Sequence, residues 1–382
     1  METAGVIAHP PRDLHARRIA IAGGGTAGHV QPALAIAEAY RGAVPDVDVL
    51  FLGTAGGAEA RLVPEHGYRL ATLTAAPFFG VGPAGRLRSV GALVAGAVQA
   101  RRLLRGERVE LVLGLGNFAA AGAVLGGRTL GLPAVIHEAN AVAGVANRLL
   151  GRWVDRVLLG FPDAAASFSR ATPVVTGTPV RTALRSVAAA RDGARDPETP
   201  RLLVLGGSQG SPFLNARVPE VVARVVRRGL ALQVCHQTGR GDAGAVRAAY
   251  ERAGVAARVV SSLDDMARAY RWADVAISCA GAVTLAELAI VGLPALVVPL
   301  ATAALDHQRA NARAFAAASG VWWTSEDAWD ATLVAERLAA LVASPGERRV
   351  AAARMTAAAA PDAAARIVAA CETLLAGTGG AR

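Results

Sequence analysis

Apolar and polar positions follow a regular order along the chain, with short apolar strands followed by amphipathic helices. In the first half, apolar strands are predicted at 19–22, 47–52, 69–74, 111–113, 134–137, 154–158 and 174–176. In the second half, they are predicted at 202–205, 230–236, 257–261, 275–278, 295–299 and 320–323. Strands that alternate with helices favour parallel sheets covered on both faces, with ligands at the carboxyl ends of the strands. The pattern predicts an α/β protein with two Rossmann-like domains.

Two glycine-rich turns each join an apolar strand to an amphipathic helix. The first reads Gly-Gly-Gly-Thr-Ala-Gly-His at 23–29, and the second reads Gly-Gly-Ser-Gln-Gly at 206–210. Such a turn points backbone N–H groups and the positive end of a helix dipole at one spot, which suits phosphate. The alternative is an ordinary tight turn between strand and helix that binds no ligand. Two such turns predict two domains that face each other across a cleft, with substrate phosphate on each side.

The length of 382 residues suits two domains that each bury a core. We expect a loose tail at 1–17, a first domain at 18–185, a linker at 186–200, a second domain at 201–360, and a final helix at 361–382 that can reach back to the first domain. The longest apolar stretch, 288–304, is broken by Gly292 and Pro294. We interpret it as helix, turn and strand, not as a membrane span.

The composition narrows the class of partner. A net charge of +10 leaves anionic lipid, nucleic acid and phosphorylated substrates as candidates. Nucleic acid is disfavoured, because no basic run with interleaved aromatic residues is present. Three cysteines without metal-type spacing indicate a reducing compartment, and the first residues lack the apolar core of a secretion signal. We expect a soluble or membrane-peripheral protein of the cytoplasm.

Several short motifs stand in a characteristic order along the chain. They are Gly-Gly-Gly-Thr-Ala-Gly-His-Val-Gln-Pro-Ala at 23–33, His-Glu-Ala-Asn at 137–140, Ala-Gly-Val-Ala-Asn at 143–147, Gly-Thr-Pro-Val-Arg at 177–181, Gly-Gly-Ser-Gln-Gly at 206–210, His-Gln-Thr-Gly at 236–239, Asp-Asp-Met at 264–266 and Ala-Gly-Ala-Val-Thr-Leu-Ala-Glu at 280–287. Over residues 18–345 they resemble the MurG family, the undecaprenyl-pyrophosphoryl-MurNAc-pentapeptide N-acetylglucosaminyltransferases. The resemblance implies a GT-B fold and metal-independent, cofactor-free inverting transfer from UDP-GlcNAc to a lipid-linked acceptor at the inner face of the cytoplasmic membrane.

The resemblance also implies a donor site in the second domain. Its expected members are Gly207, Ser208, Gln209, Met266, Ala282, Val283, Thr284, Glu287, His307 and Gln308. Ser208 and nearby backbone N–H groups would hold the pyrophosphate. Glu287 would accept hydrogen bonds from both ribose hydroxyls, which a carboxylate can do; the alternative is a solvated helix carboxylate. His307 and Gln308 would read the donor sugar, and the backbone before Met266 would face the uracil.

The first domain is expected to hold the acceptor. Its expected contacts are Thr26, Gly28, His137, Asn140 and Asn147, with Arg181 on phosphate or at a hinge. His29 is the expected base, and Glu138 is its rival. From the residues alone, His29 is as well explained by a helix start. The group around Glu138 is either a site or a structural hydrogen-bond network.

Three departures from the family pattern surround the expected site. Cys279 stands where the family usually has Arg, Asn117-Phe118 stands where it has Gly-Tyr, and the loop at 77–83 lacks the expected basic-glycine character. An Arg lost there removes a charge that could steady the leaving diphosphate. Two alternatives therefore stay open: a related transferase of secondary metabolism acting on a phosphoglycolipid or another acceptor, and a non-catalytic paralogue that binds nucleotide sugar.

The expected membrane contact is the first domain's Gly/Pro-rich loop at 77–85, together with arginines that follow it. Phe78, Phe79 and Val81 would enter the headgroup boundary, and the arginines that follow would meet anionic lipid. Those arginines are Arg86, Arg88, Arg101, Arg102 and Arg105. The alternative is a buried loop whose phenylalanines complete the core.

Overall fold

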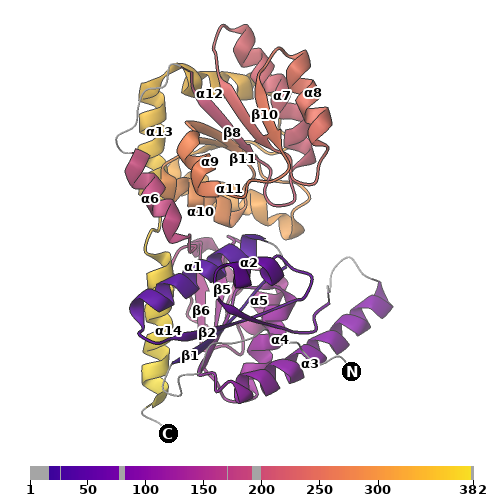
Figure 1. The fold of residues 1–382 in the computed structure, drawn as a ribbon, viewed down its shortest axis with the longest axis vertical. Helices are drawn as coiled ribbons and strands as arrows, with labels where there is room; N and C mark the ends of the chain where they lie inside the picture. Colours follow the sequence, from indigo (N-terminus) through magenta and orange to yellow (C-terminus); the bar gives the residue numbers. More distant parts are fainter. Residues whose placement is uncertain (1–16, 26, 77–81, 170, 192–198, 380–382) are drawn as a thin grey trace. The chain divides into compact units, whose positions relative to one another are not determined.

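The computed structural model describes residues 17–25, 27–76, 82–169, 171–191 and 199–379. The chain divides into two compact units, one formed by Met1–Arg181 with Asp362–Arg382 and the other by Thr182–Pro361 (Figure 1). The boundary therefore precedes the predicted one at residue 185. Helix α6 (Thr182–Arg191) packs against α9 (Met266–Trp272) and α10 (Ala282–Val291), so the start of the predicted linker is a helix of the second unit. Its alanines favour that helix.

The first unit contains a parallel sheet in the order β3-β2-β1-β4-β5-β6-β7. Its strands are β1 (Arg18–Ala22), β2 (Asp48–Gly53), β3 (Arg69–Thr72), β4 (Leu111–Gly114), β5 (Ala134–Glu138), β6 (Arg156–Leu159) and β7 (Val174–Val175). In β1, Ile19 and Ile21 pack in one core and Ala20 and Ala22 in the other, as the two-residue period of a buried strand requires. The strand order reverses between β1 and β4, which is where open sheets of this kind bind ligands.

Helices cover both faces of the first sheet. They are α1 (Ala27–Ala43), α2 (Glu59–Glu65), α3 (Pro83–Gly106), α4 (Asn117–Arg128), α5 (Val145–Leu150), the 3₁₀ turn Pro162–Ser167 and α14 (Ala363–Gly379). Helix α14 packs against α1, and its Ile367, Val368 and Cys371 join the core that contains Ile19. Burial raises the pKa of the Cys371 thiol to about 12, so this cysteine is a neutral core residue. The last helix thus returns to the first unit.

The second unit contains a parallel sheet in the order β10-β9-β8-β11-β12-β13. Its strands are β8 (Arg201–Leu205), β9 (Gln233–Gln237), β10 (Ala257–Val260), β11 (Val275–Ser278), β12 (Ala295–Val297) and β13 (Trp322–Trp323). Its remaining helices are α7 (Pro212–Arg227), α8 (Ala243–Arg252), the 3₁₀ turn Ala304–Asp306, α11 (His307–Ser319), α12 (Ala331–Ala343) and α13 (Pro345–Ala357). The order reverses between β8 and β11, so the turn after β8 lies at the switch point of this sheet.

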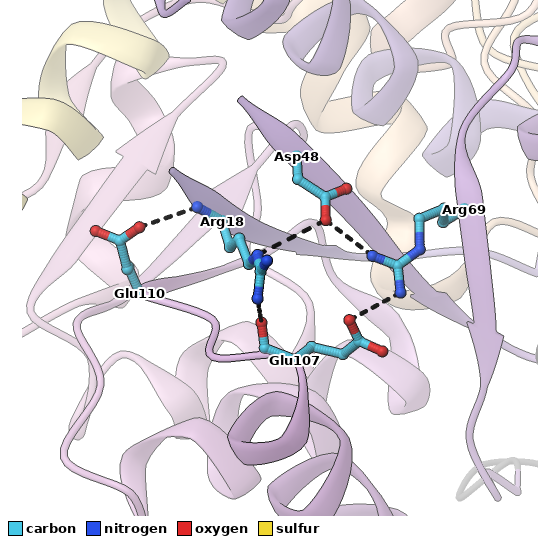
Figure 2. Close-up of polar contacts among 5 residues, drawn as sticks. All are labelled: Arg18, Asp48, Arg69, Glu107 and Glu110. Carbon is cyan, nitrogen blue, oxygen red and sulfur yellow. Dashed lines mark hydrogen bonds and ion pairs between the residues drawn. The ribbon is translucent and has the colours of Figure 1, made fainter. Parts of the chain in front are cut away.

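An ionic network closes the amino-terminal edge of the first sheet, opposite the glycine-rich turn (Figure 2). Arg18 is buried, and its guanidinium donates to the Glu107 carbonyl oxygen at 3.0 Å. The backbone N–H of Arg18 donates to Glu110 Oε1 at 3.0 Å. Arg69 lies 2.8 Å from both Asp48 and Glu107. Burial opposes the charge on Arg69, but these two carboxylates raise its pKa overall. The network ties three strands to the end of α3.

The apolar stretch at 288–304 folds as the sequence predicts. Helix α10 ends at Val291, Gly292 adopts a left-handed conformation with φ of +61°, and β12 follows. Throughout the described ranges of the chain, no helix combines the length and the apolar character that crossing a bilayer requires.

Candidate functional site

The turn after β8 requires glycine at three positions. A Cβ on Gly206 would lie 2.5 Å from the Ser211 nitrogen, and a Cβ on Gly210 would lie 2.0 Å from the Thr238 carbonyl oxygen. Gly207 has a φ of +79°, a backbone conformation that residues other than glycine rarely adopt. The turn therefore packs backbone against backbone with the loop after β9.

The outer part of this turn is open to a ligand. Ser208 and Gln209 are exposed, and no described group of the protein accepts a hydrogen bond from the backbone N–H of either residue. Helix α7 begins directly afterwards, with the Ser211 side chain accepting from the Leu214 N–H at 3.2 Å. Free N–H groups at a helix N-terminus form an anion site. This geometry fits the predicted contacts of Gly207, Ser208 and Gln209 with a diphosphate.

Two polar side chains at the end of β9 hold the turn after β8 and the two helices α7 and α8: Gln237 contacts the turn, and His236 contacts the helices. Gln237 accepts from the Gly206 N–H at 3.2 Å and donates to the Gly207 carbonyl at 3.0 Å. His236 lies 2.9 Å from the Tyr250 hydroxyl and 3.1 Å from Asn215 Oδ1. Burial lowers the pKa of His236 to about 4, so the ring is neutral at pH 7. Both side chains are buried and act as a brace.

Glu287 is held in place by a buried tyrosine. Its Oε2 accepts a hydrogen bond from the Tyr270 hydroxyl at 2.8 Å, and the carboxylate is only 6% exposed. It lies in α10, whose first residues Ala282, Val283 and Thr284 are buried or half-buried. Tyr270, on α9, was not singled out in the sequence, because a tyrosine in an amphipathic helix is usually a core residue. This hydrogen bond fixes the orientation of the Glu287 carboxylate.

Gln308 joins the ends of two neighbouring strands. Its Oε1 accepts from the N–H of Ala280 and of Leu300, both at 3.0 Å. The side chain is half-buried. His307 is also half-buried, with Nδ1 2.6 Å from the Ala304 carbonyl oxygen, and Met266 is half-buried at the start of α9. The second unit therefore brings the expected donor residues to the carboxyl ends of β8, β11 and β12 and to the start of α9 beside them.

Cys279 carries no charge into this site. It is 3% exposed, and burial raises the pKa of its thiol to about 12, although a hydrogen bond with the Ser211 side chain acts in the opposite direction. The thiol packs in the core of the second unit. The positive charge that the family usually has at this position is absent.

The turn after β1 has a different environment from the one after β8. The Gly25 N–H donates to Glu59 Oε2 at 2.7 Å, and a Cβ on Gly24 would lie 2.1 Å from Glu59 Oε1. Asn117 Nδ2 donates to the Gly24 carbonyl oxygen from the other side. The sequence predicted phosphate at this turn, and the structure shows that the part formed by Gly24 and Gly25 contacts a carboxylate of the protein. Glu59 was missed, since a single Glu at the start of a short helix is an ordinary capping residue.

His29 and Asn147 both lie near Gly116, which follows β4. A Cβ on Gly116 would be 3.9 Å from His29 Nε2 and 3.7 Å from Asn147 Nδ2. His29 is half-buried. Asn147 is buried, and its Oδ1 has no hydrogen-bond partner among the described residues. A buried acceptor of this kind costs about 1–3 kcal/mol unless a ligand donates to it.

Glu138 has both carboxylate oxygens engaged by the protein. Oε1 accepts from the backbone N–H and the side-chain amide of Asn140 at 2.9 and 3.0 Å. Oε2 accepts from the Gly144 N–H and from Asn147 Nδ2, both at 2.9 Å. With 4% exposure and four donors, Glu138 shapes the loop that carries Asn140 and Asn147. The structure thus brings these three residues together, as the sequence suggested.

His137 lies under this loop. Its Nε2 is 3.0 Å from the Gly177 carbonyl oxygen, and burial lowers its pKa, so the neutral ring donates to that carbonyl. Arg181 is half-buried at the end of the first unit, and Gly28 is exposed at the start of α1. Thr26 and residues 77–81, with Phe78, Phe79 and Val81, lie outside the described residues.

Comparison with known proteins covers both units. Residues 19–159 match the glycosyltransferase family 28 N-terminal domain, and residues 201–367 match the glycosyltransferase family 28 C-terminal domain. A UDP-N-acetylglucosamine–N-acetylmuramyl-(pentapeptide) pyrophosphoryl-undecaprenol N-acetylglucosamine transferase of Acidithiobacillus ferrooxidans is 43% identical over 354 residues, which are 92% of this chain and 96% of that protein. The protein of the same name from Geobacter metallireducens is 38% identical over 329 residues, 86% of this chain and 90% of that one.

Solved structures of glycosyltransferases have a similar fold. A crystal structure of MurG from Acinetobacter baumannii aligns with a TM-score of 0.71 and 28% identity, over 94% of this chain and 99% of that one. The glycosyltransferase of kitacinnamycin aligns with a TM-score of 0.64 at 17% identity, over 96% of this chain and 100% of that one. The second likeness concerns the fold alone.

Proposed function

Because the chain belongs to the MurG family of UDP-N-acetylglucosamine transferases within glycosyltransferase family 28, we propose that it transfers GlcNAc from UDP-GlcNAc to a lipid-linked MurNAc-pentapeptide. The C4 hydroxyl of MurNAc attacks C1 of the donor sugar, the C1–O bond to UDP breaks, and a β-1,4 disaccharide and UDP result. The identity of 38–43% over most of the chain carries this proposal. The family also establishes the two-domain GT-B fold and the glycosyltransferase class.

The leaving UDP is stabilised by backbone groups in this proposal. Negative charge grows on the diphosphate as the C1–O bond breaks, and the N–H groups of Ser208 and Gln209 at the start of α7 are preorganised for it. The neighbouring α10 presents a second helix N-terminus after β11. We propose that these dipoles act without an essential metal ion, and that they carry more of the charge here because Cys279 supplies none.

Glu287 selects the nucleoside part of the donor. Tyr270 fixes the orientation of the carboxylate, so that the ribose hydroxyls meet an acceptor already in place. Gln308 holds the strand ends on which the sugar lies, and its amide N–H₂ group supplies donors for sugar hydroxyls.

His29 acts as the base that takes the proton of the attacking hydroxyl. Its half-buried imidazole stands beside Asn147, whose buried Oδ1 is an available acceptor for an acceptor-sugar hydroxyl. Glu138 is the weaker candidate, because all four hydrogen bonds described for its carboxylate come from the loop that it shapes. It would have to leave these donors to reach a substrate.

Helix α3 provides the membrane contact in this proposal. Leu87 is 76% and Val94 is 58% exposed, and Val90 and Val98 extend the same stripe at helical spacing. Arg86, Arg88, Arg102 and Arg105 are exposed on the same helix. Apolar side chains flanked by arginines suit an anionic bilayer, with about 1 kcal/mol per basic residue near the surface. A lipid-linked acceptor requires such a contact.

The experiment that tests the function is an acceptor panel. Purified protein is incubated with UDP-GlcNAc and, separately, with lipid-linked MurNAc-pentapeptide, a phosphoglycolipid and no acceptor, and UDP release is measured. We expect fast release only with the first acceptor, with or without EDTA. Preference for the phosphoglycolipid would assign a different acceptor, and UDP binding without turnover on any acceptor would assign a non-catalytic role.

A further inference from the structure

Glu59 is a buried carboxylate inside the first glycine-rich turn, and none of the steps above uses it. The side chain is 1% exposed. Its Oε2 accepts from the Gly25 N–H at 2.7 Å, and its Oε1 accepts from the Thr54 N–H at 2.7 Å and the Thr54 hydroxyl at 2.8 Å. Hydrogen bonds to a carboxylate are shorter and stronger than those between neutral groups. These three bonds anchor the turn to the end of β2.

Three glycines from separate segments leave room for this carboxylate. A Cβ on Gly24, Gly53 or Gly57 would lie 2.1, 2.5 or 2.1 Å from the nearest Glu59 atom. One glycine follows β1, one ends β2, and one precedes α2. The cradle is therefore fitted to a carboxylate of the protein. A phosphate entering it would meet the Glu59 charge at contact distance, which is strongly unfavourable in a buried position.

The anchored turn leads directly to His29. Gly25 precedes α1, and His29 lies in the first turn of that helix. Asn117 Nδ2 holds the Gly24 carbonyl from the opposite side, and Asn117 Oδ1 accepts from the Ala120 N–H at 3.1 Å. Consecutive residues of the turn are thus held by two side chains from the first residues of different helices, α2 and α4. The His29 ring lies near Gly116, the residue that precedes Asn117.

We propose that Glu59 is the internal anion of the first turn and a positioning residue for His29, an inference that rests on the proposed role of His29 in the transfer. The acceptor phosphate binds outside this turn. Loss of the carboxylate lets the start of α1 shift, and a displacement of about 1 Å of a catalytic group costs up to about 100-fold in rate. The donor site in the second unit is unaffected.

The kinetic test compares Glu59→Gln with a matched control. Gln keeps the shape but turns an N–H₂ group toward backbone donors, so we expect kcat to fall about 30- to 100-fold, while KM for UDP-GlcNAc changes less than about twofold. Glu110→Gln is the control, because Glu110 accepts the Arg18 N–H at the other end of β1. Its kcat should stay within about twofold of wild type. Thr54→Val, which removes one donor to Glu59 at little risk to folding, should lower kcat about threefold to tenfold.

A second readout does not depend on turnover. Hydrogen exchange at the Gly25 amide should be at least about tenfold faster in Glu59→Gln than in wild type, and unchanged in Glu110→Gln. If wild type does not turn over lipid-linked MurNAc-pentapeptide, the proposed function fails while exchange still tests the anchor. Folded Glu59→Gln and Thr54→Val proteins with wild-type kcat, or unchanged Gly25 exchange, would overturn the inference. So would an equal loss of kcat in Glu110→Gln.

Discussion

The glycine-rich turn after β1 and the one after β8 share a sequence pattern and a place in their sheets, but their N–H groups have different partners. In the first turn, the Gly25 N–H donates to Glu59 Oε2 at 2.7 Å. In the second, Ser208 and Gln209 are exposed, and within the described residues their N–H groups have no protein acceptor. Gly24 of the first turn makes room for a side chain, and Gly210 of the second makes room for a neighbouring loop.

This difference separates two uses of one motif. An open turn at a helix N-terminus binds an anion that arrives with a ligand, whereas a filled turn is rigid before any ligand arrives. The second arrangement suits a donor that must be bound and released as UDP. The first suits a base that must keep one position. The variants below test whether each turn has the role assigned to it.

The largest effect is expected on the acceptor side. His29→Ala should lower kcat about 1,000-fold, because it removes a general base, while KM for UDP-GlcNAc changes less than about twofold. Steady-state kinetics with the lipid-linked acceptor measure both constants, and His66→Ala on the exposed end of α2 is the control. Near-normal turnover of His29→Ala would shift the base to Glu138 and leave the first turn without a catalytic role.

Glycine substitution should separate conformational strain from steric overlap in the second turn. Gly207→Ala meets no atom within 4 Å but retains a φ of +79°, so we expect a loss of about 1 kcal/mol in the free energy of unfolding. Gly210→Ala adds overlap with the Thr238 carbonyl at 2.0 Å, and we expect a loss of about 3 kcal/mol. Urea unfolding measures both. Equal losses would mean that the two loops are not packed as described.

Substitution in the expected donor site should lower the affinity for UDP. Glu287→Ala should weaken UDP binding about 30-fold, or about 2 kcal/mol, because the ribose loses a charged acceptor. Isothermal titration calorimetry gives the affinity, and Glu220→Ala on the exposed face of α7 is the control. Unchanged affinity in Glu287→Ala would remove this residue from the donor site and weaken the assignment of the second turn.

The stability of the protein should depend on pH through His236, which lies at the end of β9. The pKa of His236 is about 4 in the folded protein and about 6.5 when unfolded, so the unfolded state takes up more protons between these values. Stability is therefore complete above pH 6.5 and falls as the pH drops toward 4. Between pH 7 and 5, urea unfolding should show a loss of about 1–2 kcal/mol that His236→Gln reduces. His137, whose pKa is also lowered, contributes in the same direction. The same pH dependence in His236→Gln as in wild type would contradict this role.

The sequence predicted the fold closely because its signals are local. The alternation of apolar strands with helices predicted both sheets, and Gly292 with Pro294 correctly divided the stretch at 288–304 into a helix and a strand. The donor residues were implied by the family resemblance, and their role stays a prediction. The residues at 186–191 were misread, since a polar, alanine-rich segment is equally consistent with a linker and a helix.

The role of the first turn could not be predicted, because it depends on a contact between segments. Gly25 and Glu59 are separated by the whole of α1 and β2, and only the folded sheet brings them together. Tyr270 and Glu287 form a similar pair across two helices. One signal was present: Glu59 follows Gly57 in the segment after β2, and the absence of a side chain at Gly57 leaves space for the Glu59 carboxylate.

The most direct test of the contrast is a crystal structure of the protein soaked with UDP and with excess inorganic pyrophosphate. We predict that the diphosphate of UDP lies within hydrogen-bond distance of the Ser208 and Gln209 N–H groups, while Glu59 remains bound to Gly25 and no pyrophosphate enters the first turn. Pyrophosphate bound at Gly24 and Gly25 with the Glu59 side chain displaced would contradict the account.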